Sequence, residues 1–133
     1  SIQLCHIDAV PDNFLFVTGK DGSEKIKLTD WEYAGMQDPH LDVAMFIIYA
    51  MYDRDSAEKL IDLYFSDGCD KATRLKIYCY IAVSGLVWSN WCEFKRHCGV
   101  EFGAYAQRQY DYAREYTKIF FKEYREAFGR DYV

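Results

Sequence analysis

The sequence predicts an α+β fold that is mainly helical, with one short β-hairpin followed by about four helices. Half of the 133 residues are hydrophobic and 18% are aromatic, which supplies enough apolar surface for a folded core. Two short alternating runs flank a turn near the N-terminus, and longer runs with helix start and stop signals fill the rest. The length fits one domain, or a piece of a larger one.

The hairpin is predicted from residues 14–18 and 25–30. In the second run Ile26 and Leu28 alternate with lysine and threonine, as in a strand with one apolar face. Residues 19–24 read Gly-Lys-Asp-Gly-Ser-Glu and are dense in residues that favour turns. A hairpin of this kind brings the residues at its two ends close together.

The remaining elements are a loop and four helices. Residues 31–40 contain Gly35 and Pro39 and are expected to form the loop. Helices are expected over residues 42–51, from a cap at Asp55 or Ser56 to about Gly68, from a cap at Asp70 to about His97, and over 102–128. An aromatic stripe on one face of the last helix is interpreted as core packing: Tyr105, Tyr112, Tyr116, Phe120 and Tyr124.

Charge and cysteine content narrow the class of protein. The formal net charge of -5 argues against general binding to nucleic acid or to an anionic membrane, and it is compatible with a cationic substrate and Mg²⁺. Five cysteines without a CxxC motif indicate reduced thiols. The apolar run 77–88 is too short to cross a bilayer, and no signal-peptide pattern is visible, so a cytoplasmic location is expected.

Three side chains that carry oxygen atoms flank the predicted hairpin. Asn13 precedes its first strand, Asp30 ends its second strand, and Asp8 lies in the preceding loop. Phosphoryl transfer from ATP needs a carboxylate that accepts or orients the proton of the attacking hydroxyl, and hard oxygen ligands that hold Mg²⁺ against the phosphates. The order Asp, Asn, hairpin, Asp therefore favours a kinase.

The surrounding motifs resemble the aminoglycoside phosphotransferase and choline kinase superfamily. His6-Ile-Asp-Ala-Val-Pro-Asp-Asn13 looks like its Brenner-type motif. The stretch Leu28-Thr-Asp-Trp-Glu-Tyr-Ala-Gly-Met-Gln-Asp-Pro39, followed by Asp42, is similar to the second motif of choline and ethanolamine kinases, and it most resembles bacterial LicA-type choline kinases. The resemblance implies the C-terminal lobe of a protein-kinase-like fold, so residues 1–133 would form a catalytic and substrate-binding lobe that lacks its nucleotide-binding N-terminal lobe.

The resemblance also implies roles for individual residues. Asp8 would be the catalytic base, and His6 would shape the catalytic loop. Asn13 and Asp30 would be Mg²⁺ ligands, and Asp42 would support the loop structurally. Glu32 would lie near the metal or the substrate. Ile7 and Gln37 depart from the usual pattern, which bears on fine specificity and not on class.

An aromatic cage for an ammonium group is expected on the third helix. Trp88 and Trp91 are three positions apart and share a helix face. Aromatic rings attract quaternary ammonium ions by ~0.5–2 kcal/mol each. With Tyr33 they are the candidate cage, and Asp8 or Glu32 would add negative charge. A Trp-x-x-Trp pair of this kind resembles the choline pocket of choline kinases, so choline is the expected acceptor and ATP with Mg²⁺ the expected donor.

Several alternatives stay open at this level. The chain has no Gly-rich phosphate loop and no strand lysine of the kind that holds ATP, so residues 1–133 alone are expected to be inactive. Apolar surface facing the missing lobe leaves a homodimer open. The acceptor could instead be ethanolamine, thiamine or an aminoglycoside. A non-catalytic choline-binding or pseudokinase-like module, or a helical interaction domain, is the remaining reading.

Overall fold

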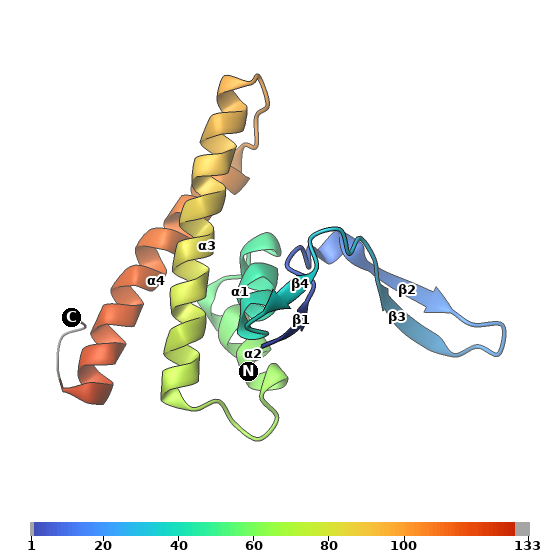
Figure 1. The fold of residues 1–133 in the computed structure, drawn as a ribbon, viewed down its shortest axis with the longest axis horizontal. Coiled ribbons are helices and arrows are strands. Elements are labelled where there is room, and N and C mark those ends of the chain that lie inside the picture. The colour runs from blue at the N-terminus through green and yellow to red at the C-terminus, as the bar shows by residue number, and fades with distance from the viewer. Residues whose placement is uncertain (1, 130–133) are drawn as a thin grey trace.

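A β-hairpin extends from one side of a body of four helices (Figure 1). The computed structural model describes residues 2–129. The strands are β1 Gln3–Cys5, β2 Phe14–Thr18, β3 Glu24–Leu28 and β4 Gly35–Gln37, with a 3-10 turn at Pro11–Asn13. The helices are α1 His40–Tyr49, α2 Arg54–Tyr64, α3 Lys71–His97 and α4 Ala104–Phe128. The predicted α+β, mainly helical fold is confirmed.

The hairpin has the predicted first strand and a shorter second strand. β2 pairs antiparallel with β3, with Phe14 opposite Leu28 and Phe16 opposite Ile26. The second strand was expected to reach residue 30, but it ends at Leu28. Asp30 has a φ of 63°, in the left-handed region, and this turns the chain out of the extended conformation.

The loop expected over residues 31–40 contains a strand that the sequence did not predict. β4 pairs antiparallel with β1, with Leu4 opposite Met36 and Cys5 opposite Gly35. Both strands have three residues, too few for an alternating pattern to be visible. The pairing places His6, which follows β1, beside the start of α1.

The first two helices begin earlier than predicted. α1 starts at His40 and not at residue 42, because Pro39 is compatible with a helix N-terminus, where its missing N–H is not needed. α2 is capped by Asp53 and not by Asp55 or Ser56: the Asp53 carboxylate accepts a hydrogen bond from the Ser56 N–H at 2.9 Å.

The last two helices follow the prediction closely. Asp70 caps α3 as expected and accepts a hydrogen bond from the Thr73 N–H at 3.0 Å. α4 begins at Ala104, two residues after the expected start, because Gly103 adopts φ 53° and ψ -132°, which is not helical. Gly129 ends α4 in the left-handed conformation that helix C-termini favour.

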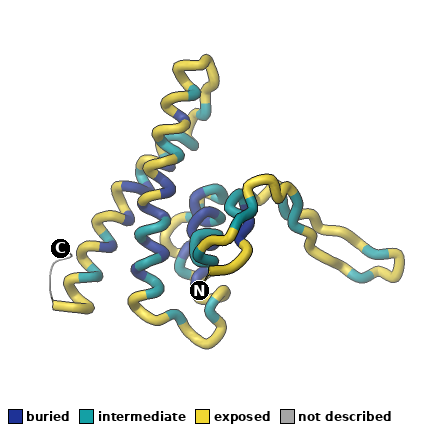
Figure 2. Tube along the Cα trace, in the orientation of Figure 1, coloured by how far each residue is buried: buried dark blue, intermediate teal, exposed yellow. Residues whose placement is uncertain are grey.

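The core lies where α1 and α2 pack on the α3–α4 pair. Figure 2 shows that buried residues gather along this junction while the hairpin is mostly exposed. α3 and α4 approach closely at Gly85, where an added Cβ would lie 2.7 Å from the Gln109 carbonyl oxygen. Core side chains come from all four helices and include Ala44, Ile47, Ile48, Ile61, Ile77, Tyr78, Ile81, Tyr112 and Tyr116. The predicted core role is confirmed for Tyr112, Tyr116 and Phe120.

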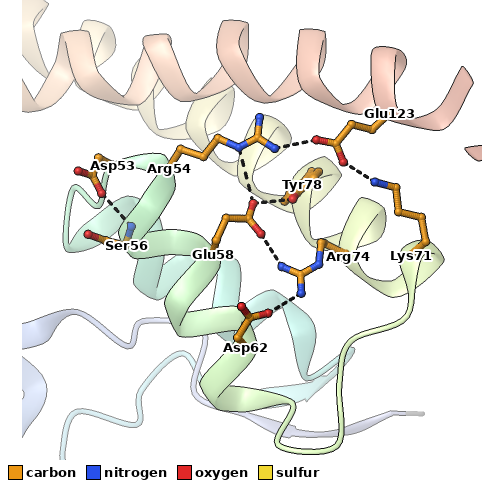
Figure 3. Close-up of polar contacts among 9 residues, drawn as sticks. All are labelled: Asp53, Arg54, Ser56, Glu58, Asp62, Lys71, Arg74, Tyr78 and Glu123. Atoms are coloured by element: carbon orange, nitrogen blue, oxygen red, sulfur yellow. Dashed lines mark hydrogen bonds and ion pairs between the residues drawn. The ribbon is translucent and has the colours of Figure 1, made fainter. Parts of the chain in front are cut away.

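A network of charged groups joins α2 to both long helices (Figure 3). Glu123 of α4 accepts hydrogen bonds from Arg54 at 2.7 Å and from Lys71 at 2.6 Å. Glu58 of α2 pairs with Arg74 and accepts a hydrogen bond from the Tyr78 hydroxyl at 2.5 Å. The short α2 is therefore held by ion pairs as well as by its apolar residues.

No helix within residues 2–129 is both long enough and apolar enough to cross a bilayer. All five cysteines are free thiols, in agreement with the sequence-based prediction.

Candidate active site

The loop that follows β1 is held by a carboxylate of α1. Asp42 accepts hydrogen bonds from the backbone N–H groups of His6 and Ile7, each at 2.8 Å and each to a different carboxylate oxygen. Ile7 has a φ of 70°, which is unusual for a β-branched residue. The two bonds compensate this strained conformation and fix the direction in which the chain enters Asp8.

The ring of His6 links this loop to the far end of the hairpin. Its Nε2 lies 2.7 Å from the carbonyl oxygen of Thr29, and because a carbonyl can only accept, Nε2 carries the proton. The ring is 2% exposed and packs edge-on against Trp31, with centroids 4.7 Å apart. His6 is thus buried between the two segments and does not face open solvent.

Asn13 joins the loop that carries Asp8 to the strand end that precedes Asp30. Its Nδ2 donates to the Asp8 carbonyl oxygen at 3.0 Å. Its own carbonyl oxygen accepts from the N–H and the hydroxyl of Thr29, at 3.0 and 3.2 Å. The hairpin therefore brings the Asp8 and Asn13 segment beside the residue before Asp30, as its geometry predicted.

The oxygen-bearing side chains at this position are of the chemical type that binds a magnesium ion shared with a phosphate. An ion of this kind takes one or two protein oxygen ligands and completes its shell with water and phosphate oxygens. Asn13 and the exposed Asp30 offer one amide oxygen and one carboxylate. Between residues 2 and 129 no group of three or more His, Cys, Asp or Glu side chains is arranged to hold a metal without such a phosphate.

Asp8 also contacts an aromatic region formed by the helices. Burial raises the pKa of the Tyr49 hydroxyl, and the charge of Asp8 and a hydrogen bond with its carboxylate raise it further. Burial, with smaller contributions from neighbours that include Asp8, raises the pKa of Tyr105 to about 12. Both phenols therefore stay protonated at neutral pH, and the Tyr49 hydroxyl can donate to Asp8.

The position of Tyr49 is fixed by α4. The Gln109 side chain is fully buried and donates from Nε2 to the carbonyl oxygen of Ile48 at 2.9 Å, next to Tyr49. The Tyr112 hydroxyl donates to the Tyr52 carbonyl oxygen at 2.5 Å. These bonds satisfy carbonyl groups at and after the α1 C-terminus and hold the end of that helix against α4.

Five aromatic rings form a continuous row beside Asp8. The centroid distances are 5.6 Å for Tyr49–Trp88, 5.2 Å for Trp88–Trp91, 5.2 Å for Trp91–Phe102 and 6.4 Å for Phe102–Tyr105. We call Tyr49, Trp88, Trp91, Phe102 and Tyr105 the aromatic row. A cavity of about 420 Å³, called the inner cavity here, is lined by Tyr49, Phe102, Tyr105 and the loop residues Val10, Pro11 and Asp12.

Two of the predicted substrate residues lie apart from this row. Glu32 and Tyr33 follow Asp30 in an exposed turn, closed by a hydrogen bond from the Ala34 N–H to the Trp31 carbonyl oxygen. Among the described residues Tyr33 has no ring contact with Trp88 or Trp91, and its side chain is 62% exposed. The structure brings the two tryptophans together and leaves Tyr33 outside their cluster.

Three residues of the aromatic row were missed by the sequence analysis. Tyr49 ends an apolar run, Phe102 follows a helix stop signal, and Tyr105 was assigned to the core stripe of α4. Tyr105 is the first member of that stripe and instead lines the inner cavity. Tyr105 lies close to the turn between α3 and α4 that contains Gly99 and Gly103. This position was the sequence signal for a cavity-lining role, because a residue at a helix end can face a cavity.

The chain is similar in sequence and in fold to known proteins. LicA from Haemophilus influenzae is 30% identical over 124 residues, which cover 84% of this chain and 42% of that protein. The solved structure of the choline kinase LicA from Streptococcus pneumoniae matches with a TM-score of 0.64 and 29% identity, over 90% of this chain and 41% of that one. A structure of LicA in complex with AMP matches with a TM-score of 0.66 and 28% identity, over 90% and 40%.

The chain therefore spans about two fifths of the length of these relatives. The kinase-like C-terminal fold and the LicA resemblance predicted from the motifs are confirmed. The model of the phosphotransferase enzyme family matches residues 1–78, more than half of the chain and all of the segment that carries Asp8, Asn13, Asp30 and Asp42. The chain belongs to the phosphotransferase enzyme family.

Proposed function

We propose that this chain is the catalytic and substrate-binding part of an enzyme that phosphorylates the hydroxyl group of choline, or of a related amino-alcohol, with ATP. The observation that carries the proposal is the position of Asp8. Its backbone carbonyl oxygen accepts a hydrogen bond from Asn13 on the side of the hairpin, and its charge lies near enough to Tyr49 of the aromatic row to raise the pKa of that hydroxyl. In this proposal a single residue connects the pair that would hold the metal ion with the surface that would bind the ammonium group.

In this proposal Asp8 is the catalytic base. Its carboxylate accepts the proton of the acceptor hydroxyl as that oxygen bonds to the γ-phosphorus of ATP, while the bond from this phosphorus to the ADP oxygen breaks and ADP leaves. The Tyr49 hydroxyl donates to the same carboxylate and orients it. His6 and Asp42 are positioning residues, because their bonds go to backbone groups on both sides of the site and not into the inner cavity.

Asn13 and Asp30 would hold the magnesium ion. When bound, this ion neutralises phosphate charge and orients the group that is transferred. Asp30 directly follows Thr29, whose N–H and hydroxyl donate to the Asn13 carbonyl oxygen, so the two proposed ligands occupy neighbouring positions in the fold. ATP as the donor is supported by the family match and by the LicA structure that contains AMP.

The aromatic row would bind the ammonium group of the acceptor. The tryptophan pair, two tyrosines and a phenylalanine supply π faces, and Asp8 supplies a negative charge. A quaternary ammonium has no N–H groups to satisfy, so an aromatic surface suits it better than it suits a primary amine. The choline kinase described for Streptococcus pneumoniae supports the same choice.

The rest of the enzyme would supply the nucleotide-binding lobe. This chain covers 42% of the length of LicA from Haemophilus influenzae, so we expect residues 1–133 alone to be inactive. An apolar groove of about 380 Å³ at the base of the hairpin, lined in part by Phe14, Leu28, Phe46 and Leu60, is the surface that we assign to contact with the missing lobe.

The test is an acceptor panel with the full-length protein, ATP and Mg²⁺, using choline, ethanolamine, thiamine and an aminoglycoside. Choline should be the preferred acceptor. Asp8→Asn should lower kcat by roughly 10²–10⁴-fold while choline still quenches tryptophan fluorescence. Asp67→Asn, an exposed aspartate outside the site, is the matched control and should leave kcat unchanged.

The aromatic row is tested in the same assay. Trp91→Ala should raise the KM for choline by about tenfold, the loss of one cation–π contact, and leave the KM for ATP unchanged. Equal changes in both values would contradict the cage. Choline binding without phosphorylation of any acceptor by the wild-type protein would instead indicate a non-catalytic binding module.

A further inference from the structure

Phe102 lies between two cavities. One is the inner cavity beside Asp8, which Phe102 lines with Tyr49 and Tyr105. The other has a volume of about 400 Å³, lies between α3 and α4, and is also lined by Phe102. We call this second space the outer cavity. The ring of Phe102 is therefore a wall that the two cavities share.

The two cavities differ in chemistry. The inner cavity has three aromatic residues and Asp12 in its lining, and the charge of Asp8 lies near one of these residues, Tyr49. The outer cavity carries hydrogen-bonding and charged groups, among them Asn90, Glu93, Arg96, Glu101, Gln107 and Tyr110. Arg96 is already paired with Glu93 at 2.7 Å, so Glu101 gives this space an excess of negative charge. The lining of the outer cavity also includes Cys92, Ala106 and the ring of Tyr110, which would contact an apolar substituent, while the negative charge would suit the ammonium group that carries the substituent.

The backbone holds Phe102 in the shared wall. Its ring packs on Trp91 at 5.2 Å and on Tyr105 at 6.4 Å. The next residue, Gly103, has φ 53° and ψ -132°, a conformation that residues with a side chain avoid. A Cβ at Gly103 would meet nothing within 4 Å, so the position requires glycine for its backbone conformation and not for space. The turn thus fixes the position of Phe102 just before the start of α4.

We propose that Phe102 is a specificity-determining residue that limits the size of the groups on the acceptor nitrogen. This inference rests on the proposed function, because it assumes that the ammonium group binds in the inner cavity. With Phe102 in place, the cavity ends at the ring and accommodates methyl groups. Without the ring, the inner cavity opens into the outer cavity and accepts a larger substituent.

The test compares choline with benzyl(2-hydroxyethyl)dimethylammonium, whose benzyl group matches the side chain that Phe102→Ala removes. In the full-length protein, Phe102→Ala should raise the ratio of kcat/KM for the benzyl compound to kcat/KM for choline by about tenfold or more, the range expected for pocket size. Phe94→Ala is the matched control, since Phe94 lies on α3, is 64% exposed and lines neither cavity. A ratio that stays within twofold of wild type in Phe102→Ala overturns the proposal.

A second substitution tests the route into the outer cavity. Ala106 lines that space, so Ala106→Phe added to Phe102→Ala should fill it and return the ratio toward the wild-type value. An unchanged ratio in the double variant would mean that the benzyl group does not enter the outer cavity, which also overturns the proposal. Phe102→Leu keeps more of the packing and should give an intermediate ratio if Phe102→Ala proves unstable.

Binding measurements separate this proposal from the proposed function. Dissociation constants of both ammonium compounds are measured by tryptophan fluorescence for each variant. If the wild-type protein phosphorylates neither compound, the proposed reaction fails, and the ratio of the two dissociation constants still decides the role of Phe102. A tenfold shift of that ratio in Phe102→Ala alone supports the size limit, and no shift rejects it.

Discussion

At the scale of single residues, the strained backbone around Asp8 depends on Asp42. Ile7 adopts a left-handed conformation that costs a residue with a side chain roughly 1–2 kcal/mol. Both oxygens of Asp42 accept backbone hydrogen bonds from this turn, and bonds to a charged acceptor are stronger than neutral ones. The carboxylate therefore stabilises a conformation that the local sequence does not favour.

Asp42→Asn should destabilise the protein and impair turnover together. The amide oxygen can accept one of the two bonds, but the amide NH₂ would face the other backbone N–H and leave it without an acceptor. The expected loss is about 1.5–3 kcal/mol of unfolding free energy, measured by urea denaturation. Asp55→Asn, an exposed position in the first turn of α2, is the control and should change stability by less than about 0.5 kcal/mol. An equal loss of unfolding free energy in both variants would show that Asp42 does not specifically stabilise the turn at Ile7.

At the scale of elements, the ion pairs of Figure 3 decide how α2 is attached to the body. α2 has only two fully buried residues, Ala57 and Ile61. Arg54 connects it to α4 through Glu123, and Glu58 connects it to α3 through Arg74. Burial alone would raise the pKa of Glu123, but the hydrogen bonds from Lys71 and Arg54 outweigh burial and lower it.

The lowered pKa of Glu123 predicts a pH-dependent contribution to stability. The contribution is present above the unfolded pKa of about 4.3 and is lost as the pH falls through the lower folded value. Glu123→Gln should therefore cost about 1 kcal/mol near neutral pH, since both partners are partly exposed, and nothing once the wild-type carboxylate is protonated. Unfolding by urea between about pH 3 and pH 7 checks this. A difference in unfolding free energy between variant and wild type that persists at the lowest pH would contradict this prediction. Glu126→Gln, at a more exposed position on the same helix, is the control and should show almost no such difference at any pH.

At the scale of the whole molecule, the hairpin leaves apolar surface in contact with solvent. Phe16 is 83% exposed and its partner Ile26 is 63% exposed, and both lie on the face that continues through Phe14 and Leu28 into the apolar groove. The two-stranded ribbon also leaves both of its outer edges without strand partners in its sheet. Continuous apolar surface of this kind marks an interaction site.

Residues 1–133 should therefore self-associate through the hairpin when studied alone. The double substitution Phe16→Ser and Ile26→Thr should shift the chain toward monomer in sedimentation velocity while the melting temperature changes little, because both side chains are largely exposed. Leu63→Ser on α2, where the side chain is 79% exposed, is the control and should leave association unchanged. Equal self-association of the double variant and the wild-type chain would argue against the hairpin as the association interface.

The helices and the hairpin could be predicted because their signals are local. Asp70 with its capping bond, the turn residues 19–24 and the stop at Gly129 act within a few positions of the elements that they bound. The pairing of β1 with β4 could not be predicted, because two three-residue strands far apart in the chain carry no pattern of their own. Asp53 was missed as a cap because Asp55 and Ser56 offer the same chemistry nearby.

By itself, the sequence determined which side chains carry the chemistry: Asp8, Asn13 and Asp30 around the hairpin, and the tryptophan pair. It also determined the family that these motifs resemble. Only the tertiary structure decided which aromatic rings join the tryptophan pair in the aromatic row. Tyr49 ends α1, whereas Phe102 and Tyr105 flank the start of α4, and the proximity of these two segments depends on how α1 and α4 pack and on the turn at Gly103. The physical reason is that motifs depend on short-range chain geometry, whereas a binding surface depends on contacts between distant segments.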